Sequence, residues 1–127
     1  MKTRYTVALS MLAGALLGAT AIQGLHAQAK PRAFVVAEVD VTNQEGFIKE
    51  YVPLAVKALT ESGSKPVVRG GKTATIEGAP PKRVVINSFD SLEQAVAAYN
   101  SAAYKEARKV GNKYATFRVY AAEALAQ

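Results

Sequence analysis

Two strand–helix–strand patterns follow one another along the chain and are joined by a short turn. The first strand is predicted at Ala33–Thr42, where one set of alternating residues is entirely apolar and the other ends in two carboxylates. Later strands are predicted at Lys65–Ile76, Lys82–Phe89 and Thr116–Ala121, and the tail from Ala122 onwards is expected to fray. A glycine pair inside Lys65–Ile76 indicates either one long strand with a bend or two short strands. Its short connection to Lys82–Phe89 predicts antiparallel pairing.

Each of the two helical patterns carries an interruption. The first has an apolar stripe formed by residues at helical spacing, namely Phe47, Tyr51, Leu54, Ala55, Ala58 and Leu59. Pro53 lies within this stripe and predicts a kink, because proline lacks a backbone donor and disfavours helical angles at the preceding residue. Gly63 is the expected end of that helix. The second pattern has an N-cap at Ser91, a second cap at Ser101 and a stop at Gly111, so it is predicted to break and restart.

The order strand, helix, strand, strand, helix, strand is the split βαβ, or ferredoxin-like, arrangement. It predicts an α+β fold, in which a four-stranded antiparallel sheet carries two kinked helices on one face. The other face would then be open, and it would carry apolar side chains such as Phe34, Val36 and Val68. Because a large apolar sheet face is seldom left in water, we expect a second copy of the chain to cover it and form a homodimer by sheet-on-sheet packing.

The chain begins with the features of a bacterial-type signal peptide. A basic start precedes the apolar run Tyr5–Ile22, and small residues follow at Ala27 and Ala29, in the pattern that a signal peptidase recognises. We therefore predict a signal peptide at 1–29, cleaved after Ala27 or Ala29, one ferredoxin-like domain at 30–127, and a periplasmic or secreted location without a membrane anchor. The alternative is an uncleaved anchor, because the apolar run approaches the roughly 20 residues that span a bilayer.

The composition excludes several kinds of site. The 127 residues hold 16 Lys and Arg against 10 Asp and Glu, and these basic residues are spread along the chain, so nucleic-acid binding is not expected. The chain has no cysteine, and its single histidine, His26, lies in the predicted signal peptide. Without His or Cys, the mature chain lacks the ligands of a usual zinc site, of a His- or Cys-ligated haem and of an iron–sulfur cluster. It also lacks the residues of Ser-His-Asp or Cys-His catalysis. We therefore expect no metal and no cofactor.

The stretch Arg69-Gly70-Gly71-Lys72 is the first candidate site. An arginine beside two glycines can present its guanidinium fork and free backbone N–H groups to a carboxylate, a phosphate or an enolate. The structural alternative is a bulge that twists the strand, with Arg69 in solvent or paired with a carboxylate such as Glu38. Glu38 is also a candidate ligand-binding residue, although carboxylates at the end of a strand are usually solvated.

Tyr51, Tyr99 and Tyr104 are the second candidate set, and Tyr51 and Tyr99 lie on the inward stripes of the two helical patterns. Their hydroxyls could donate to a ligand between helices and sheet, or they could be core aromatics with satisfied hydroxyls. Asn87 interrupts the apolar run of a central strand, so it must be hydrogen-bonded if it is buried. It either lines the same pocket or faces a turn or the dimer seam. Tyr104 and Tyr120 are interpreted as packing or dimer-interface residues.

Several segments, in this order along the chain, resemble one known family. They are Ala33–Thr42, Tyr51-Val52-Pro53, Val68-Arg69-Gly70-Gly71, and Ala98-Tyr99-Asn100-Ser101 followed by Tyr104. Together they resemble the family called domain of unknown function 1330, over essentially the whole mature chain. The resemblance implies a ferredoxin-like subunit of a dimeric α+β barrel. That superfamily includes cofactor-independent monooxygenases, small isomerases, haem enzymes and proteins with no known activity.

Three functional hypotheses follow. The first is an exported homodimer that binds a small anionic or aromatic molecule between its helices and its sheet. The second is a cofactor-independent monooxygenase or isomerase, in which Arg69 would stabilise an enolate or phenolate while a tyrosine or Glu38 moves a proton. A carboxylate or tyrosine would need a large pKa shift for that work, and the sequence shows no device for it. We therefore favour the binding protein. The third hypothesis is a purely structural assembly subunit.

Overall fold

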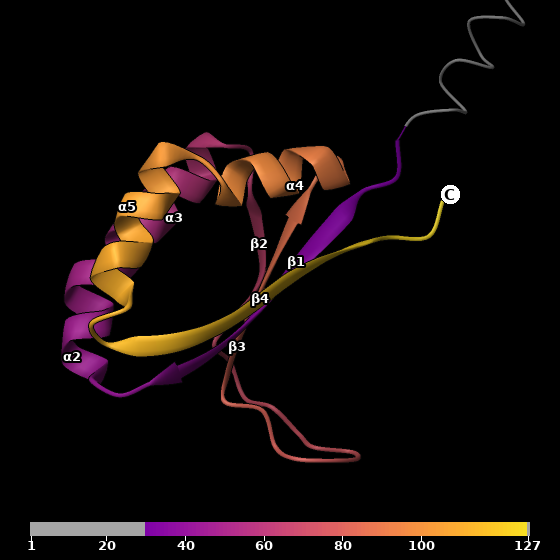
Figure 1. Cartoon of the computed structure of the whole chain (residues 1–127). Coiled ribbons are helices and arrows are strands. Elements are labelled where there is room, and N and C mark those ends of the chain that lie inside the picture. Colours follow the sequence, from indigo (N-terminus) through magenta and orange to yellow (C-terminus); the bar gives the residue numbers. More distant parts are fainter. Residues whose placement is uncertain (1–29, 127) are drawn as a thin grey trace, which may run out of the picture. The chain divides into compact units, whose positions relative to one another are not determined.

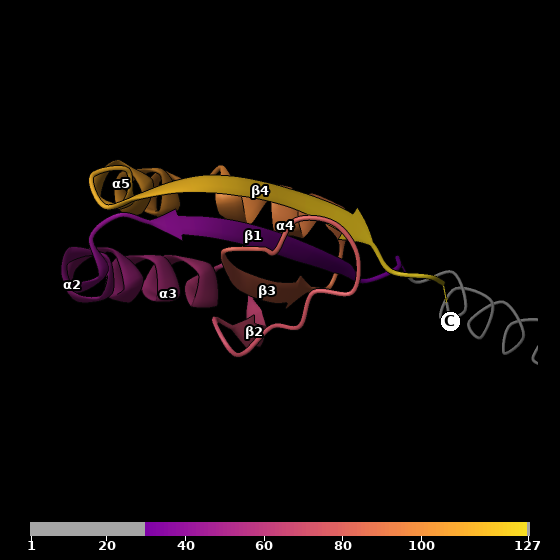
Figure 2. The ribbon, with the colours of Figure 1, turned by 90° about the horizontal axis from the view of Figure 1, so that it is seen from below.

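The computed structural model describes residues 30–126, whereas the predicted signal peptide at residues 1–29 lies outside the described residues. The elements of the described part are β1 Ala33–Val41, α2 Gln44–Gly46, the π-helical turn η1 Phe47–Tyr51, α3 Val52–Glu61, β2 Lys65–Arg69, β3 Arg83–Phe89, α4 Leu92–Tyr99, α5 Ala102–Gly111 and β4 Ala115–Glu123. The sheet order is β2-β3-β1-β4, and all neighbouring strands are antiparallel. The longer helices lie on one face of this sheet (Figure 1, Figure 2). The predicted ferredoxin-like α+β fold is confirmed.

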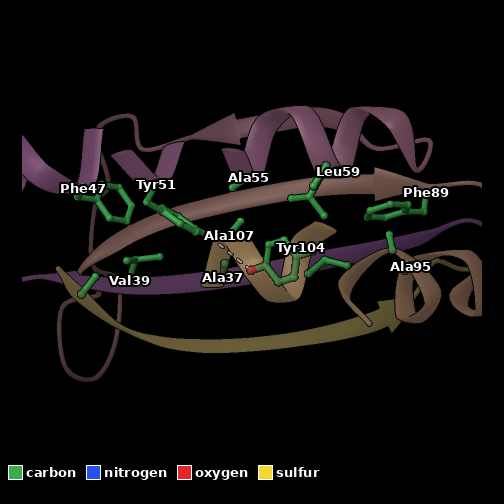
Figure 3. Packing of buried hydrophobic residues seen from close by; sticks show 14 of the residues in the cluster. Ala37, Val39, Phe47, Tyr51, Ala55, Leu59, Phe89, Ala95, Tyr104 and Ala107 are labelled. Carbon is green, nitrogen blue, oxygen red and sulfur yellow. Dashed lines mark hydrogen bonds between the residues drawn. The ribbon is translucent and has the colours of Figure 1, made fainter. Parts of the chain in front are cut away.

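The strict alternation of β1 places the core between the sheet and the helices. The side chains of β1 that face the helices are buried at four successive positions, Ala33, Val35, Ala37 and Val39. Aromatic rings from the helices and from β3 complete the packing, among them Phe47, Tyr51, Phe89 and Tyr104 (Figure 3). Removal of this apolar surface from water is the main term that stabilises the fold.

The interruption predicted at Pro53 is a π-helical turn. In η1 the backbone hydrogen bonds span five residues instead of the four of an α-helix. The Val52 N–H donates to the Phe47 carbonyl, five residues back. Pro53 then occupies the first turn of α3, where its missing N–H matters least. Leu54 follows this turn within α3, off the face that Ala55, Ala58 and Leu59 bury, and its side chain is 46% exposed. The prediction that Leu54 belongs to the buried stripe is therefore wrong.

The helix ends follow the predicted capping residues. Gly63 has a φ of +91° and ends α3, and it lies in the left-handed region where an L side chain is strained. The Ser91 hydroxyl accepts from the Gln94 N–H at 3.1 Å, and the Ser101 hydroxyl accepts from the Tyr104 N–H at 3.3 Å. These two caps start α4 and α5 and confirm that the second helical region breaks and restarts.

β2 is shorter than the sequence suggests. It ends at Arg69, and the chain then leaves the sheet in a long loop, so no strand reaches Ile76, whose side chain is 94% exposed. The turning point is Gly70, which has a φ of +66°. The irregularity in the pairing lies between Pro66 and Val68 instead of at the glycine pair, because proline has no N–H for the ladder. The prediction of a strand over Lys65–Ile76, bent or divided, is therefore wrong beyond Arg69.

β4 is longer than predicted. Ala122 and Glu123 continue the pairing with β1, opposite Phe34 and Ala33. The next N–H, that of Ala124, donates to the Arg32 carbonyl at 2.8 Å. The expectation that the chain frays from Ala122 is wrong for these residues, because backbone bonds to the start of β1 hold them.

The face of the sheet opposite the helices is apolar and carries no covering element in the described part of the chain. Strand register places on this open face the side chains of Phe34, Val36, Val68, Val84, Ile86 and Tyr120. One ion pair lies beside them, from Arg118 Nη1 to Glu38 Oε2 at 3.0 Å. Within residues 30–126, no helix has both the length and the hydropathy to span a bilayer.

Candidate functional site

A cavity lies on the covered side of the sheet, between η1–α3 and the strands β1, β2 and β3. The volume within it that the centres of water molecules can occupy is about 80 Å³. This is enough for several waters or a small organic molecule. Drug-sized sites measure roughly 300–1,000 Å³, so a ligand of this cavity must be small. Its walls are mostly apolar and include Ala37, Val39, Val52, Ala55, Leu59 and Val85. Its polar side chains include Tyr51, Tyr99, Tyr104, Asn87, Arg69 and Arg83.

Tyr51 and Tyr104 supply a pair of buried hydroxyls. Tyr51 comes from η1 and Tyr104 from α5, and their hydroxyl oxygens are 3.4 Å apart (Figure 3). Gly111 at the end of α5 permits this approach, because a Cβ there would lie 2.7 Å from Cδ2 of Tyr51. Sequence reasoning treated Tyr104 as a packing or interface residue, whereas the structure places it in the cavity wall. The signal was available in its position three residues after the Ser101 cap, on the inward face of α5.

Tyr99 and Asn87 form a second polar pair in the wall. Asn87 is buried, and its Nδ2 donates to the Tyr99 hydroxyl at 3.1 Å. This bond meets the condition that the sequence sets for a buried amide in a central strand. The Tyr99 ring also packs edge-on against the Tyr104 ring, with centroids 4.6 Å apart. The two polar pairs are thereby joined into one cluster of three phenols and one amide.

Burial keeps the hydroxyls of Tyr51 and Tyr99 protonated. It raises the pKa of Tyr51 well above the ordinary value, and the neighbouring Tyr104 hydroxyl raises it further. Burial also raises the pKa of Tyr99 to about 12, although the bond from Asn87 opposes the rise by stabilising the phenolate. At neutral pH the hydroxyls of Tyr51 and Tyr99 can therefore exchange hydrogen bonds with a ligand, but these two groups do not act as bases.

Two arginines lie at the sheet side of the cavity. Arg69 pairs with Val85 in the register of β2 and β3, so it lies on the covered side, and its side chain is exposed at the cavity rim. Arg83 begins β3, and its guanidinium carbon lies 5.6 Å from the centre of the Phe47 ring. None of the described residues that line the cavity is Asp or Glu. The cavity therefore combines apolar walls with positive charge that no lining carboxylate neutralises.

Sequence reasoning missed Arg83, because the pair Lys82-Arg83 is most simply interpreted as the solvated start of a strand. The period of two could have revealed it. Counting back along β3 from Phe89 through Asn87 and Val85 leads to Arg83 on the same covered side. The next residue back, Lys82, lies outside the strand and is exposed.

The remaining predicted site residues are separated by the structure. Gly70 lies against the Arg83 guanidinium, because a Cβ built on it would be 2.3 Å from Nη1 of Arg83. Gly71 has no atom within 4 Å of the corresponding position and does not line the cavity. Glu38 lies on the open face with Arg118, so the structure does not bring it to Arg69. Within residues 30–126, no group of three His, Cys, Asp or Glu side chains could hold a metal ion.

Comparison with known proteins extends this description. The family model described as Domain of unknown function (DUF1330) matches residues 32–125. A crystal structure of a protein of unknown function from Rhodopseudomonas palustris is similar, with a TM-score of 0.62 and 16% identity over 84% of this chain and 92% of that chain. SnoaB, a cofactor-independent oxygenase from Streptomyces nogalater, is similar with a TM-score of 0.51 and 8% identity over 75% and 94% of the two chains. At such identities the likeness is one of fold. No curated protein matches the sequence.

Proposed function

We propose that this chain, which belongs to the family of domain of unknown function 1330, binds a small molecule. The ligand would be anionic or aromatic and would lie in the cavity between the helices and the sheet. The observation that carries the proposal is the charge of the cavity: Arg69 and Arg83 line it, and none of the described lining residues is a carboxylate. In an apolar setting an anion gains more from a guanidinium than it would in water.

The phenols support the same function. The hydroxyls of Tyr51 and Tyr104 lie in an otherwise apolar wall and can accept or donate a hydrogen bond to a polar group of a ligand. Phe47 and the edge-on pair Tyr99–Tyr104 offer ring surfaces that suit a flat molecule. A small ligand with one negative charge and one apolar or aromatic body matches these groups.

A screen of small aromatic and carboxylic acids tests the proposal. Thermal unfolding with each compound should reveal stabilising acids, because a ligand that binds only the folded state raises the unfolding temperature. A crystal soaked with a positive compound should then show density between Arg69, Tyr51 and Tyr99. Soaks that place every positive compound elsewhere on the surface would contradict the proposal.

A cofactor-independent monooxygenase or isomerase is the second candidate. Its support is the guanidinium pair beside neutral phenols, an arrangement that could stabilise an enolate or phenolate formed from a bound substrate. The fold is compatible, because SnoaB shares it. None of the described residues that line the cavity is a carboxylate, and burial raises the pKa values of Tyr51 and Tyr99, so neither of these phenols is suited to accept a proton at neutral pH. Oxygen uptake or isomerisation with a bound acid would promote this candidate over simple binding.

We also propose that the open face pairs with the open face of a second copy. It is apolar at its centre, and it carries charges of both signs in Glu38 and Arg118, so two copies could match by a two-fold rotation. Light scattering at micromolar concentrations should show a dimer, and introduction of a charge by Val36→Asp should give a monomer that still folds. A parent protein that scatters as a monomer would contradict this assembly.

Export is the last part of the proposal. It rests on the apolar run and the small residues before Lys30 in the sequence. Expression in a bacterial host followed by fractionation should place the protein outside the cytoplasm, and mass spectrometry should find a mature chain that begins after Ala27 or Ala29. An intact N-terminus in the membrane fraction would instead indicate an anchor.

A further inference from the structure

Arg83 has a buried side-chain N–H donor, and buried donors are seldom left without a hydrogen-bond partner. Its Nε is buried and has no hydrogen-bond partner among the described residues. The ring of Phe47 flanks its guanidinium carbon at 5.6 Å. A buried donor without an acceptor is unfavourable. In native structures such a donor usually marks the position of a water, an ion or a ligand.

One other arginine has a buried Nε without a partner in the described part of the chain, and its setting differs. Arg108 stacks on the Phe117 ring at 3.8 Å, and its Nη2 donates to Asn112 at 3.3 Å. It does not line the cavity. Arg83 does line the cavity, and no side-chain acceptor among the described residues holds it, so its guanidinium, and not that of Arg108, is placed to meet a cavity ligand.

Gly70 fixes where this guanidinium lies. A Cβ at residue 70 would be 2.3 Å from Nη1 and 2.4 Å from Cζ of Arg83, so the guanidinium rests directly on the glycine backbone. The φ of +66° at Gly70 also favours glycine there. The Gly70 N–H donates to the Val84 carbonyl at 2.9 Å, so this backbone group is already used and does not provide an anion nest for a phosphate.

We propose that the cavity selects small monocarboxylates, and that Arg83, positioned by Gly70, binds their carboxylate group. This inference rests on the proposed function of the same cavity. A planar guanidinium fork matches a carboxylate with two parallel hydrogen bonds. The apolar walls around Ala55 and Leu59 accept the body of the acid. Exposed Arg69 at the rim adds attraction that solvent screens, so it is the weaker of the two cations.

Matched acid and amide pairs test this inference by calorimetry. The probes are benzoate and benzamide, 4-hydroxybenzoate and 4-hydroxybenzamide, and 3-methylbutanoate and 3-methylbutanamide. Each acid that binds is expected to bind about 10- to 100-fold more tightly than its amide, the range expected for a charged hydrogen-bonded contact. Inorganic phosphate is expected to compete poorly. Amides that bind as tightly as their acids would overturn the carboxylate inference while leaving the proposed binding function intact. If no probe binds and no soak fills the cavity, both fail.

Variants of Arg83 and Gly70 test whether Arg83 recognises the carboxylate and whether Gly70 positions it. Arg83→Gln should abolish the preference for acid over amide, whereas Arg69→Gln should lower it by no more than about threefold. Gly70→Ala should displace the guanidinium and lower the preference, and Gly71→Ala is the matched control because nothing lies near its Cβ position. The ratio separates recognition from stability, since a merely structural loss weakens acid and amide alike. If Gly70→Ala fails to fold, Arg83→Gln and Arg83→Lys decide the question. A ratio that is unchanged in Arg83→Gln overturns the inference.

Discussion

The two faces of the sheet are built from alternate residues of the same strands, yet among the described residues an arginine is paired with a carboxylate on one face and unpaired on the other. On the open face, Arg118 is paired with Glu38 at 3.0 Å, beside apolar side chains. On the covered face, Arg83 lies over Phe47 with its Nε buried and without a partner among the described residues. A surface whose charges already neutralise one another suits contact with another surface, whereas an unpaired cation in a cavity suits an anion from solution.

The faces also differ in what their aromatic residues do. On the covered face, Phe89 is buried and its ring packs edge-on to Tyr99, with centroids 6.1 Å apart. On the open face, Tyr120 remains 46% exposed, and Arg118 lies 5.3 Å from its ring centre. The buried packing that stabilises the subunit therefore lies mainly on the covered side of the sheet. Substitutions on the two sides should separate the stability of the subunit from its assembly.

The largest effect should come from truncation on the covered face. Phe89→Ala removes a fully buried ring, and the free energy of unfolding should fall by about 3–5 kcal/mol. Phe34→Ala, one strand away on the open face, should cost less in the isolated subunit and should mainly lower the dimer fraction. Urea unfolding at two protein concentrations measures both quantities. Equal losses for the two variants at the lower concentration would show that the faces do not divide the work in this way.

High pH should weaken the covered face specifically. The folded pKa of Tyr99 is raised from 10.0 to about 12, so its stabilising contribution is complete below pH 10 and is lost as the pH rises through the folded value. For Tyr99 alone, stability should fall by about 2 kcal/mol between those two pH values. Tyr51, whose pKa is also raised, should steepen the loss.

Ultraviolet absorbance of tyrosinate during an alkaline titration measures this coupling. Tyr51 and Tyr99 should ionise together with unfolding, because burial raises the pKa of each hydroxyl in the folded state. The variant Tyr99→Phe should flatten the fall in stability above pH 10, because phenylalanine has no proton to lose. Ionisation of Tyr51 and Tyr99 before any loss of the fold would contradict the burial of these two hydroxyls.

A smaller effect is expected where a helix meets the tyrosine pair. Gly111→Ala places a Cβ 2.7 Å from Cδ2 of Tyr51 and 3.0 Å from Cζ of Phe117, so the rings must shift. We expect a net loss of about 1–2 kcal/mol, since overpacking costs more than the gain in helix propensity of alanine over glycine. Gly71→Ala is the control and should stay within about 0.5 kcal/mol of the parent. Denaturant unfolding compares the two, and a stabilised Gly111→Ala would show that the tyrosine pair has room to move.

The sequence predicts the fold well because the fold depends on periodicity. The alternation in β1, the caps Ser91 and Ser101 and the stop at Gly63 are local signals, and each lies where the structure uses it. The errors lie where local signals compete. Ala74 and Ile76 continue a strand-like alternation past Gly70, but the left-handed backbone at Gly70 turns the chain away from its partner strand.

The candidate site was harder to predict, because a cavity is assembled from elements distant in sequence. Tyr51 and Tyr99 were proposed from the inward stripes of the helices, Arg69 from its glycine neighbours, and Asn87 with a turn or dimer-seam position as the alternative; all four line the cavity. Glu38 was included on the strength of its charge, but the period of two in β1 puts it on the open face. Arg83 shows the reverse error, since a charged residue at the start of a strand is normally solvated. The period of two in β3 places it on the covered side, whereas its contact with the backbone of residue 70 is tertiary and cannot be inferred from the sequence.

The smallest effect should come from the open-face ion pair. Glu38→Gln removes the partner of Arg118, whose side chain is 76% exposed. Exposed pairs contribute roughly 0–1 kcal/mol, so the free energy of unfolding should change by less than about 1 kcal/mol. Added salt should shrink even that difference, because it screens the pair that the variant lacks. Ligand affinity in the cavity should stay unchanged, since Glu38 lies on the other side of the sheet. An affinity change comparable to that of Arg83→Gln would mean that the two faces communicate through β1, and the separation of binding from assembly would no longer hold.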